Sequence, residues 1–137
     1  MRYFLDTNII IYFLKKKYPE IREHLMGVPS QSIVIPSVVR AEIEYGARKS
    51  ADYTKTIRLY RKFMDAFHTE GFDECCTEAY GKIREDLEKK GMVIGPNDLM
   101  TAATVISKDG VLITHNTKEF SRIEGLRIED WTEDIVL

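Results

Sequence analysis

The sequence predicts an α/β fold, a three-layer α/β/α sandwich in which helices cover both faces of a mostly parallel central sheet. Two observations predict it. Short apolar runs alternate along the chain with segments whose apolar residues recur every three or four positions. Several of these runs lead through a polar turn into a helix, which is typical of parallel strand–helix–strand units. We expect one domain over residues 1–137.

Five short segments are expected to be the strands. The first, Tyr3–Leu5, leads directly into Asp6, and Val111–Thr114 is the strongest candidate for an interior strand. The expected strands cover residues 2–6, 32–36, 68–72, 111–114 and 126–128.

Helical spacing and capping residues predict what lies between the strands. The run Ile9–Leu14 is apolar nearly all round, so it is expected against the sheet or in a subunit interface. Thr7 or Asn8, Ser37 and Thr77 are the expected helix caps. The expected helices cover about residues 7–14, part of 19–29, a segment from 37, 53–67, 77–90 and 97–109, whereas 115–120 is expected to be a loop.

Composition excludes several classes of protein. The net charge of −2 argues against a broad basic surface for nucleic acid, although charge can be segregated on a surface. No apolar run has the length of a membrane span, and Met1-Arg2 begins no signal-peptide pattern. The two cysteines, Cys75 and Cys76, are adjacent and form neither a disulfide framework nor a spaced metal motif. We therefore expect a cytoplasmic protein without membrane association.

Five polar residues are expected at one edge of the sheet. Asp6 ends the first strand, and Glu42 lies one turn into the helix after the second. Asp98 begins the helix before the strand at 111, and Asn116 and Glu119 follow that strand. The ends of parallel strands and the starts of the following helices meet at one edge, where ligands bind in such folds.

Carboxylates that gather at this edge need a positive charge to offset their repulsion, because neighbouring negative charges raise one another's pKa. Oxygen-only ligands favour Mg²⁺ or Mn²⁺ over zinc. Such ions promote phosphodiester hydrolysis by activating water and stabilising the leaving oxygen. Taken singly, Asp6 and Asp98 are explained more simply as helix-terminal acids, and Glu42 as a solvated or paired side chain. Only their shared placement favours a site.

Several neighbouring polar residues are expected to cap helices or to orient these acids rather than to react. They are Thr7, Asn8, Ser37 and Thr114. His115 is expected to be structural or to contact phosphate, not to act as a base.

Four motifs in this order resemble the PIN-domain ribonucleases, and within them the VapC toxins of prokaryotic toxin–antitoxin systems. The resemblance covers essentially the whole chain. The motifs are Leu5-Asp6-Thr7-Asn8, Pro36-Ser37 with Glu42, Gly95-Pro96-Asn97-Asp98 with Ala102-Ala103, and Leu112 to Phe120. The closing segment from Ile123 to Trp131 fits as well.

This resemblance implies a Mg²⁺- or Mn²⁺-dependent endoribonuclease toxin that inhibits translation by cutting structured RNA, often tRNA. It implies homodimers and a cognate VapB-type antitoxin that covers the acidic cleft. It also implies that operator DNA is bound only through the toxin–antitoxin complex.

By match to the motifs, Asp6, Glu42 and Asp98 are the expected catalytic metal ligands. Many relatives have an aspartate where Asn116 stands, so the fourth ligand is either this amide or Glu119, and a second metal ion is correspondingly in question. The expected RNA contacts are Arg40, Arg48, Lys49 and Arg58.

Three other classes compete with this interpretation. An aspartyl phosphatase needs a second aspartate two residues after the first, and that position is Asn8. A dinucleotide-binding fold needs a glycine-rich turn after the first strand, which is missing here. A catalytically silent PIN-like scaffold that binds RNA or protein is the non-enzymatic alternative, and retention of all three acids argues against it.

Overall fold

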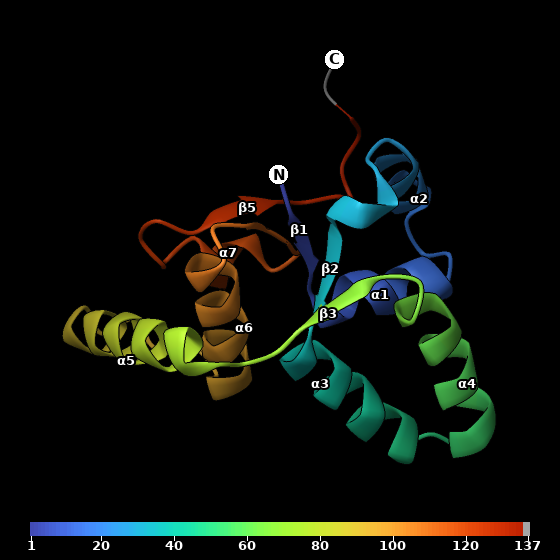
Figure 1. Cartoon of the computed structure of the whole chain (residues 1–137), viewed down its shortest axis with the longest axis horizontal. Coiled ribbons are helices and arrows are strands. Elements are labelled where there is room, and N and C mark those ends of the chain that lie inside the picture. The colour runs from blue at the N-terminus through green and yellow to red at the C-terminus, as the bar shows by residue number, and fades with distance from the viewer. Residues whose placement is uncertain (136–137) are drawn as a thin grey trace.

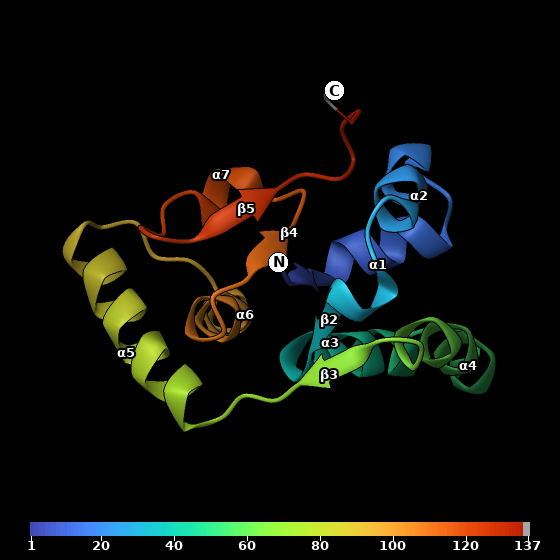
Figure 2. The same cartoon turned by 45° about the horizontal axis from the view of Figure 1, so that its top comes forward.

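A computed structural model describes residues 1–135 and shows a five-stranded sheet with helices on both faces (Figures 1 and 2). The strand order is β3-β2-β1-β4-β5, and all four pairings are parallel, so the predicted fold class is confirmed. The strands are β1 (Tyr3–Leu5), β2 (Ile33–Pro36), β3 (His68–Glu70), β4 (Val111–Ile113) and β5 (Arg127–Glu129).

Helices α1 to α4 lie on one side of the sheet, and α5 and α6 lie on the other (Figure 1). A single 3₁₀ turn, Ser30–Ser32, precedes β2. The helices are α1 (Thr7–Leu14), α2 (Pro19–Met26), α3 (Ser37–Arg48), α4 (Tyr53–Met64), α5 (Glu74–Lys89), α6 (Pro96–Ser107) and α7 (Thr117–Phe120).

Alternation along the strands separates two hydrophobic cores. Leu5 and Ile113 point to the core under α1–α4, whereas Phe4 and Leu112 point to the core under α5 and α6. This is the side-chain period of a β-strand, and all four residues are fully buried. Trp131, also buried, closes the first core beyond β5 and stacks on His24 of α2.

Three predicted helix caps are wrong. Asp6 caps α1 by accepting a hydrogen bond from the Thr7 N–H, and Asp73 caps α5 by accepting one from Cys76. The Thr77 hydroxyl donates to the Glu74 carbonyl instead. Ser37 is the first residue of α3, after Pro36. A carboxylate before each of the two helices outcompetes the later hydroxyl or amide because it faces more free N–H groups.

The segment 115–120 was expected to be a loop, and it contains α7 instead. This one-turn helix buries Phe120 in the second core, which explains why a turn so rich in polar residues is helical. In the part of the chain from 1 to 135, no helix is long and apolar enough to cross a membrane.

Candidate metal centre

Asp6 is the buried centre of the site. Its side chain is 6% exposed and stands between the end of β1 and the start of α1. One oxygen accepts from the Thr7 N–H at 2.9 Å and the other from the Thr114 hydroxyl at 2.8 Å. Burial raises the pKa of Asp6 and the charge of Glu42 adds to the rise, although these two hydrogen bonds oppose it.

Glu42 is brought to Asp6 by α3. The Thr7 hydroxyl donates to Glu42 Oε1 at 2.6 Å, which ties the first turn of α1 to the second turn of α3. Thr7 therefore touches both acids: Asp6 through its backbone and Glu42 through its side chain.

Asp98 approaches from the other face of the sheet, in the first turn of α6. Its pKa is raised to about 6, first by burial and then by the negative charges of Asp6, Glu42 and Glu119. The structure thus brings together four acids that are up to 113 residues apart in sequence (6 to 119).

Asn116 and Glu119 reach the site from the segment after β4, where the charge of Glu119 acts on Asp98. The Asn116 side-chain amide donates to Glu119 Oε2 at 2.9 Å, and its backbone N–H donates to the Thr114 hydroxyl at 3.0 Å. Because Thr114 in turn donates to Asp6, a continuous chain of hydrogen bonds joins Glu119 to Asp6.

The donor set suits a hard divalent cation. Four carboxylates and one amide offer only oxygen ligands once the cation is bound, and their mutual repulsion favours positive charge. Among residues 1–135, no three histidine, cysteine, aspartate or glutamate side chains lie so that they could hold a metal ion as they stand. The acids therefore fit such an ion by chemistry and charge, without being fully pre-arranged around it.

Only two of the four residues expected to support the acids do so by hydrogen bonds. Thr7 and Thr114 bond directly to Glu42 and Asp6. Asn8 is exposed on α1 and Ser37 is half-buried at the start of α3. Within residues 1–135, neither of these two side chains hydrogen-bonds to an acid. Sequence reasoning missed the Thr7–Glu42 pair because nothing local signals a contact 35 residues apart.

The residues expected to contact RNA differ in availability. Arg40 is engaged within the fold, donating to Thr69 at 3.0 Å and to Asp65 at 2.5 Å. Arg48 and Lys49 are exposed near the end of α3, where they lie over the rings of Tyr53 and Tyr45. Arg58 is exposed on α4, so three of the four cations face solvent.

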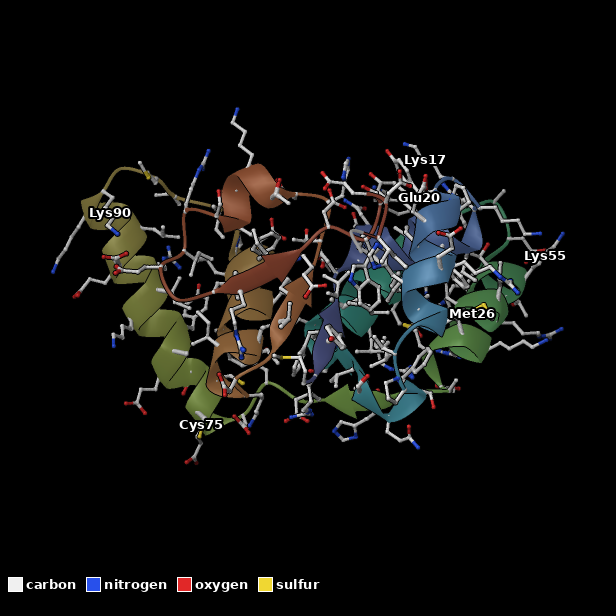
Figure 3. The ribbon with its side chains drawn as sticks, turned by 90° about the horizontal axis from the view of Figure 1, so that it is seen from above. Lys17, Glu20, Met26, Lys55, Cys75 and Lys90 are labelled. Atoms are coloured by element: carbon white, nitrogen blue, oxygen red, sulfur yellow. The ribbon has the colours of Figure 1, made fainter. Side chains whose placement is uncertain are left out.

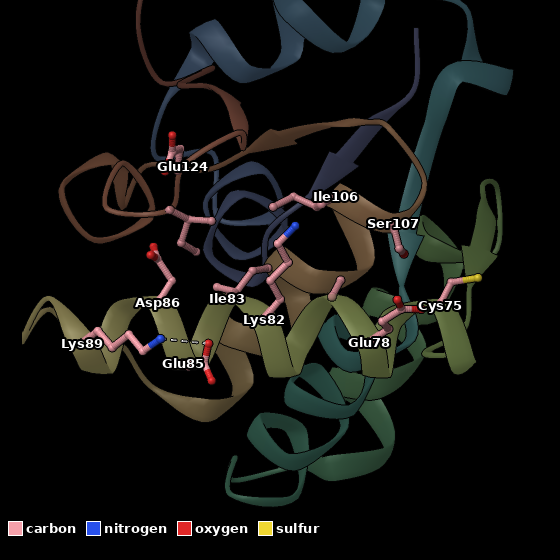
Figure 4. Close-up of a pocket in the computed structure, with 12 residues that line it drawn as sticks. Cys75, Glu78, Lys82, Ile83, Glu85, Asp86, Lys89, Ile106, Ser107 and Glu124 are labelled. Atoms are coloured by element: carbon pink, nitrogen blue, oxygen red, sulfur yellow. Dashed lines mark hydrogen bonds and ion pairs between the residues drawn. The ribbon is translucent and has the colours of Figure 1, made fainter.

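Two surface hollows lie away from the acids. One of about 730 Å³ lies along α5 and α6, and its lining includes Ile83, Ile106 and the paired side chains of Lys89 and Glu85 (Figure 4). The other, about 830 Å³, lies between α1 and α4, and Leu14, Leu59 and Lys62 line it. None of the four acids lines either hollow, so the metal centre is a separate feature.

Comparison with known proteins gives close relatives over nearly the whole chain. The PIN domain family model matches residues 3–126. Ribonuclease VapC2 of Rickettsia felis is 37% identical over 132 residues, covering 96% of this chain and 98% of that protein. The tRNA(fMet)-specific endonuclease VapC of Shigella flexneri is 33% identical over 132 residues, covering 96% and 99%.

Solved structures agree with this relationship. VapBC-1 from nontypeable Haemophilus influenzae matches with a TM-score of 0.90 and 39% identity, covering 97% of this chain and 100% of that chain. VapBC2 from Rickettsia felis, bound to a DNA fragment from its promoter, matches with a TM-score of 0.90 and 36% identity, covering 96% and 99%. The chain therefore belongs to the PIN-domain family and, within it, to the VapC ribonucleases.

Proposed function

We propose that this ribonuclease hydrolyses RNA phosphodiester bonds with a divalent cation held by Asp6, Glu42 and Asp98. The observation that carries the proposal is the convergence of four acids: hydrogen bonds from Thr114, Thr7 and Asn116 hold Asp6, Glu42 and Glu119. The Asp98 carboxyl lies near all three, and burial, followed by their negative charges, raises its pKa to about 6. When bound, Mg²⁺ or Mn²⁺ would supply a Lewis acid that activates water and offsets phosphate charge.

The chain's own residues would hold and orient these ligands. Thr114 fixes one oxygen of Asp6, and Thr7 fixes one oxygen of Glu42, so neither carboxylate rotates freely. The Asn116 amide donates to Glu119, which favours Glu119 over this amide as the fourth ligand. A second ion stays a prediction that depends on Glu119.

The substrate and partners are also part of the proposal. A relative named for tRNA(fMet) supports structured RNA, with tRNA as the first class to test. The VapBC structures support a VapB-type antitoxin as partner, and the promoter complex supports operator binding through that complex. A homodimer and a cytoplasmic location complete the proposal, and inhibition of translation would follow from tRNA cleavage.

The test compares wild type with Asp98→Asn on tRNA transcripts, with Mg²⁺, with Mn²⁺ and with EDTA, and maps the new RNA ends. Asp98 is a cleaner target than Asp6, which also caps α1. We expect discrete cuts by the wild type that EDTA abolishes and Asp98→Asn loses. Asp134→Asn makes the same change at an exposed position and should cut normally. Equal cutting by Asp98→Asn, or cutting in EDTA, would contradict the proposed site.

A further inference from the structure

Four side chains form a surface cluster that the metal centre does not use. Tyr12, Lys17, Tyr18 and His115, here called the ring cluster, come from α1, the α1–α2 connection and the end of β4. The ring centroids are 5.2 Å apart for Tyr12 and Tyr18, 6.0 Å for Tyr12 and His115, and 5.6 Å for Tyr18 and His115. The Lys17 ammonium lies 4.7 and 5.5 Å from the two tyrosine centroids.

His115 is held at one ring nitrogen. Its Nδ1 lies 2.9 Å from Asp130 Oδ2 and 3.1 Å from the Thr132 hydroxyl. Burial raises the pKa of Asp130, but the hydrogen bonds from Thr132 and His115 outweigh it and bring that pKa below its usual value. Asp130 and Thr132 both engage Nδ1, and no hydrogen bond within residues 1–135 engages Nε2. The His115 side chain is 44% exposed, which leaves ring surface open to solvent.

The ring cluster adjoins the metal centre. His115 directly follows Thr114, whose hydroxyl bonds to Asp6. Asp6 caps α1, which carries Tyr12 in its second turn, and Lys17 lies just beyond the end of this helix, beside α2 (Figure 3). The segment after β4 holds Asp6 through Thr114 and carries His115, and α1 is capped by Asp6 and carries Tyr12. Both segments therefore connect Asp6 to the ring cluster.

We propose that the ring cluster binds an unpaired nucleotide of the RNA substrate, next to the phosphate held at the metal centre. Aromatic rings stack on bases of any sequence, and a lysine ammonium beside them suits the backbone phosphate. This inference rests on the proposed function, because it assigns a contact with the RNA that the proposed metal centre would cut. The competing explanation is that the half-buried tyrosines only pack against the core.

The test measures binding of fluorescein-labelled hexauridylate by fluorescence anisotropy in EDTA, where no metal-dependent cutting occurs. We expect His115→Ala and Lys17→Ala each to weaken binding about five- to tenfold, in keeping with the cost of losing one stacking or phosphate contact. Tyr18→Phe should bind as wild type because it keeps the ring, whereas Tyr18→Leu should lose binding as His115→Ala does.

Lys16→Asn is the matched control for charge. It removes one positive charge beside Lys17, and asparagine tolerates the left-handed backbone of Lys16, whose φ is 55°. This variant should bind about as the wild type does. Thermal melts check that every variant is folded. If Tyr18→Leu does not fold, His115→Ala still decides the test.

Several results would overturn the inference. They are no measurable wild-type binding at about 100 µM protein, wild-type affinity in His115→Ala, or an equal loss in Lys16→Asn and Lys17→Ala. Unchanged RNA binding with weakened antitoxin binding would identify the cluster as a protein surface instead. The two proposals fail separately, because binding without metal tests the ring cluster and metal-dependent cutting tests the acids.

Discussion

Burial and the charges of three other carboxylates act together on Asp98. Its pKa of about 6 means that the metal-free protein holds this carboxyl in an unfavourable ionised form at neutral pH. The same environment that disfavours the ionised carboxyl would favour a bound cation. Asp98 is therefore where stability and metal binding are expected to oppose one another.

At the residue scale, we predict that Asp98→Asn stabilises the metal-free protein above pH 6. The folded pKa of about 6 exceeds the ordinary value of 3.8, so the folded state binds more protons between these values and stability falls as pH rises through them. Asparagine removes the penalty. Allowing for solvent screening of a half-buried group, the gain is about 1–2 kcal/mol at pH 7.5 and vanishes near pH 4.

Urea unfolding in EDTA at both pH values measures this gain. Asp134→Asn, exposed near the end of the described chain, should change neither value. A stability loss in Asp98→Asn at pH 7.5 would show that the carboxylate makes favourable contacts there. If the variant is both more stable and inactive, its lost cutting cannot be attributed to unfolding.

At the scale of elements, the sequence placed the acids because each lies where a strand ends or a helix begins. Periodicity locates those boundaries, and a parallel sheet brings them to one edge. Long-range pairings such as Thr7–Glu42 and Arg40–Asp65 leave no periodic trace in the sequence, so neither could be predicted from it. The RNA contact expected of Arg40 stays a prediction. Helix α7 was missed because its single turn is stabilised by burial of Phe120 and not by local spacing.

The junction between α6 and β4 offers an element-scale prediction. A Cβ at Gly110 would lie 2.3 Å from the Phe4 ring and 3.2 Å from the Arg2 carbonyl. Phe4 is fully buried and cannot move aside without disturbing the second core. Gly110→Ala should therefore lower the free energy of unfolding by about 1–3 kcal/mol, the usual cost of overpacking.

Gly81→Ala is the matched control for Gly110→Ala. Gly81 lies within α5, and a Cβ there meets nothing within 4 Å. Alanine favours the helix, so this variant should be more stable by up to about 1 kcal/mol. Denaturant unfolding of both variants should give opposite signs, and a tolerated Gly110→Ala would contradict the close approach to Phe4.

At the scale of the whole molecule, the proposed metal site draws on both faces of the sheet. Glu42 comes from α3 beside the first core, Asp98 from α6 beside the second, and Asp6 from the strand between them. A cation bound by all three would therefore link the two cores, and its binding free energy would add to the stability of the entire fold.

We predict that Mn²⁺ raises the unfolding temperature of the wild type. At a free Mn²⁺ concentration one hundred times its dissociation constant, the free energy of unfolding should rise by about 2.7 kcal/mol. Glu42→Gln should show a smaller gain because one charged ligand is lost. Thermal melts with and without Mn²⁺ measure this, with Ca²⁺ and salt-matched samples as controls. An unchanged melting temperature in the wild type at millimolar Mn²⁺ would mean that the acids hold no ion.

The cap on α1 constrains how this ribonuclease can be silenced by mutation. Cells under selection to escape a toxic nuclease accumulate substitutions that abolish cutting. A substitution of Asp6 that also removes the helix cap would in addition destabilise the folded chain. The same carboxylate that serves the site also begins the helix. Inactive but well-folded escape alleles at Asp6 should therefore be limited to residues that still cap a helix, such as asparagine, whereas Glu42 and Asp98 should accept a wider range of substitutions.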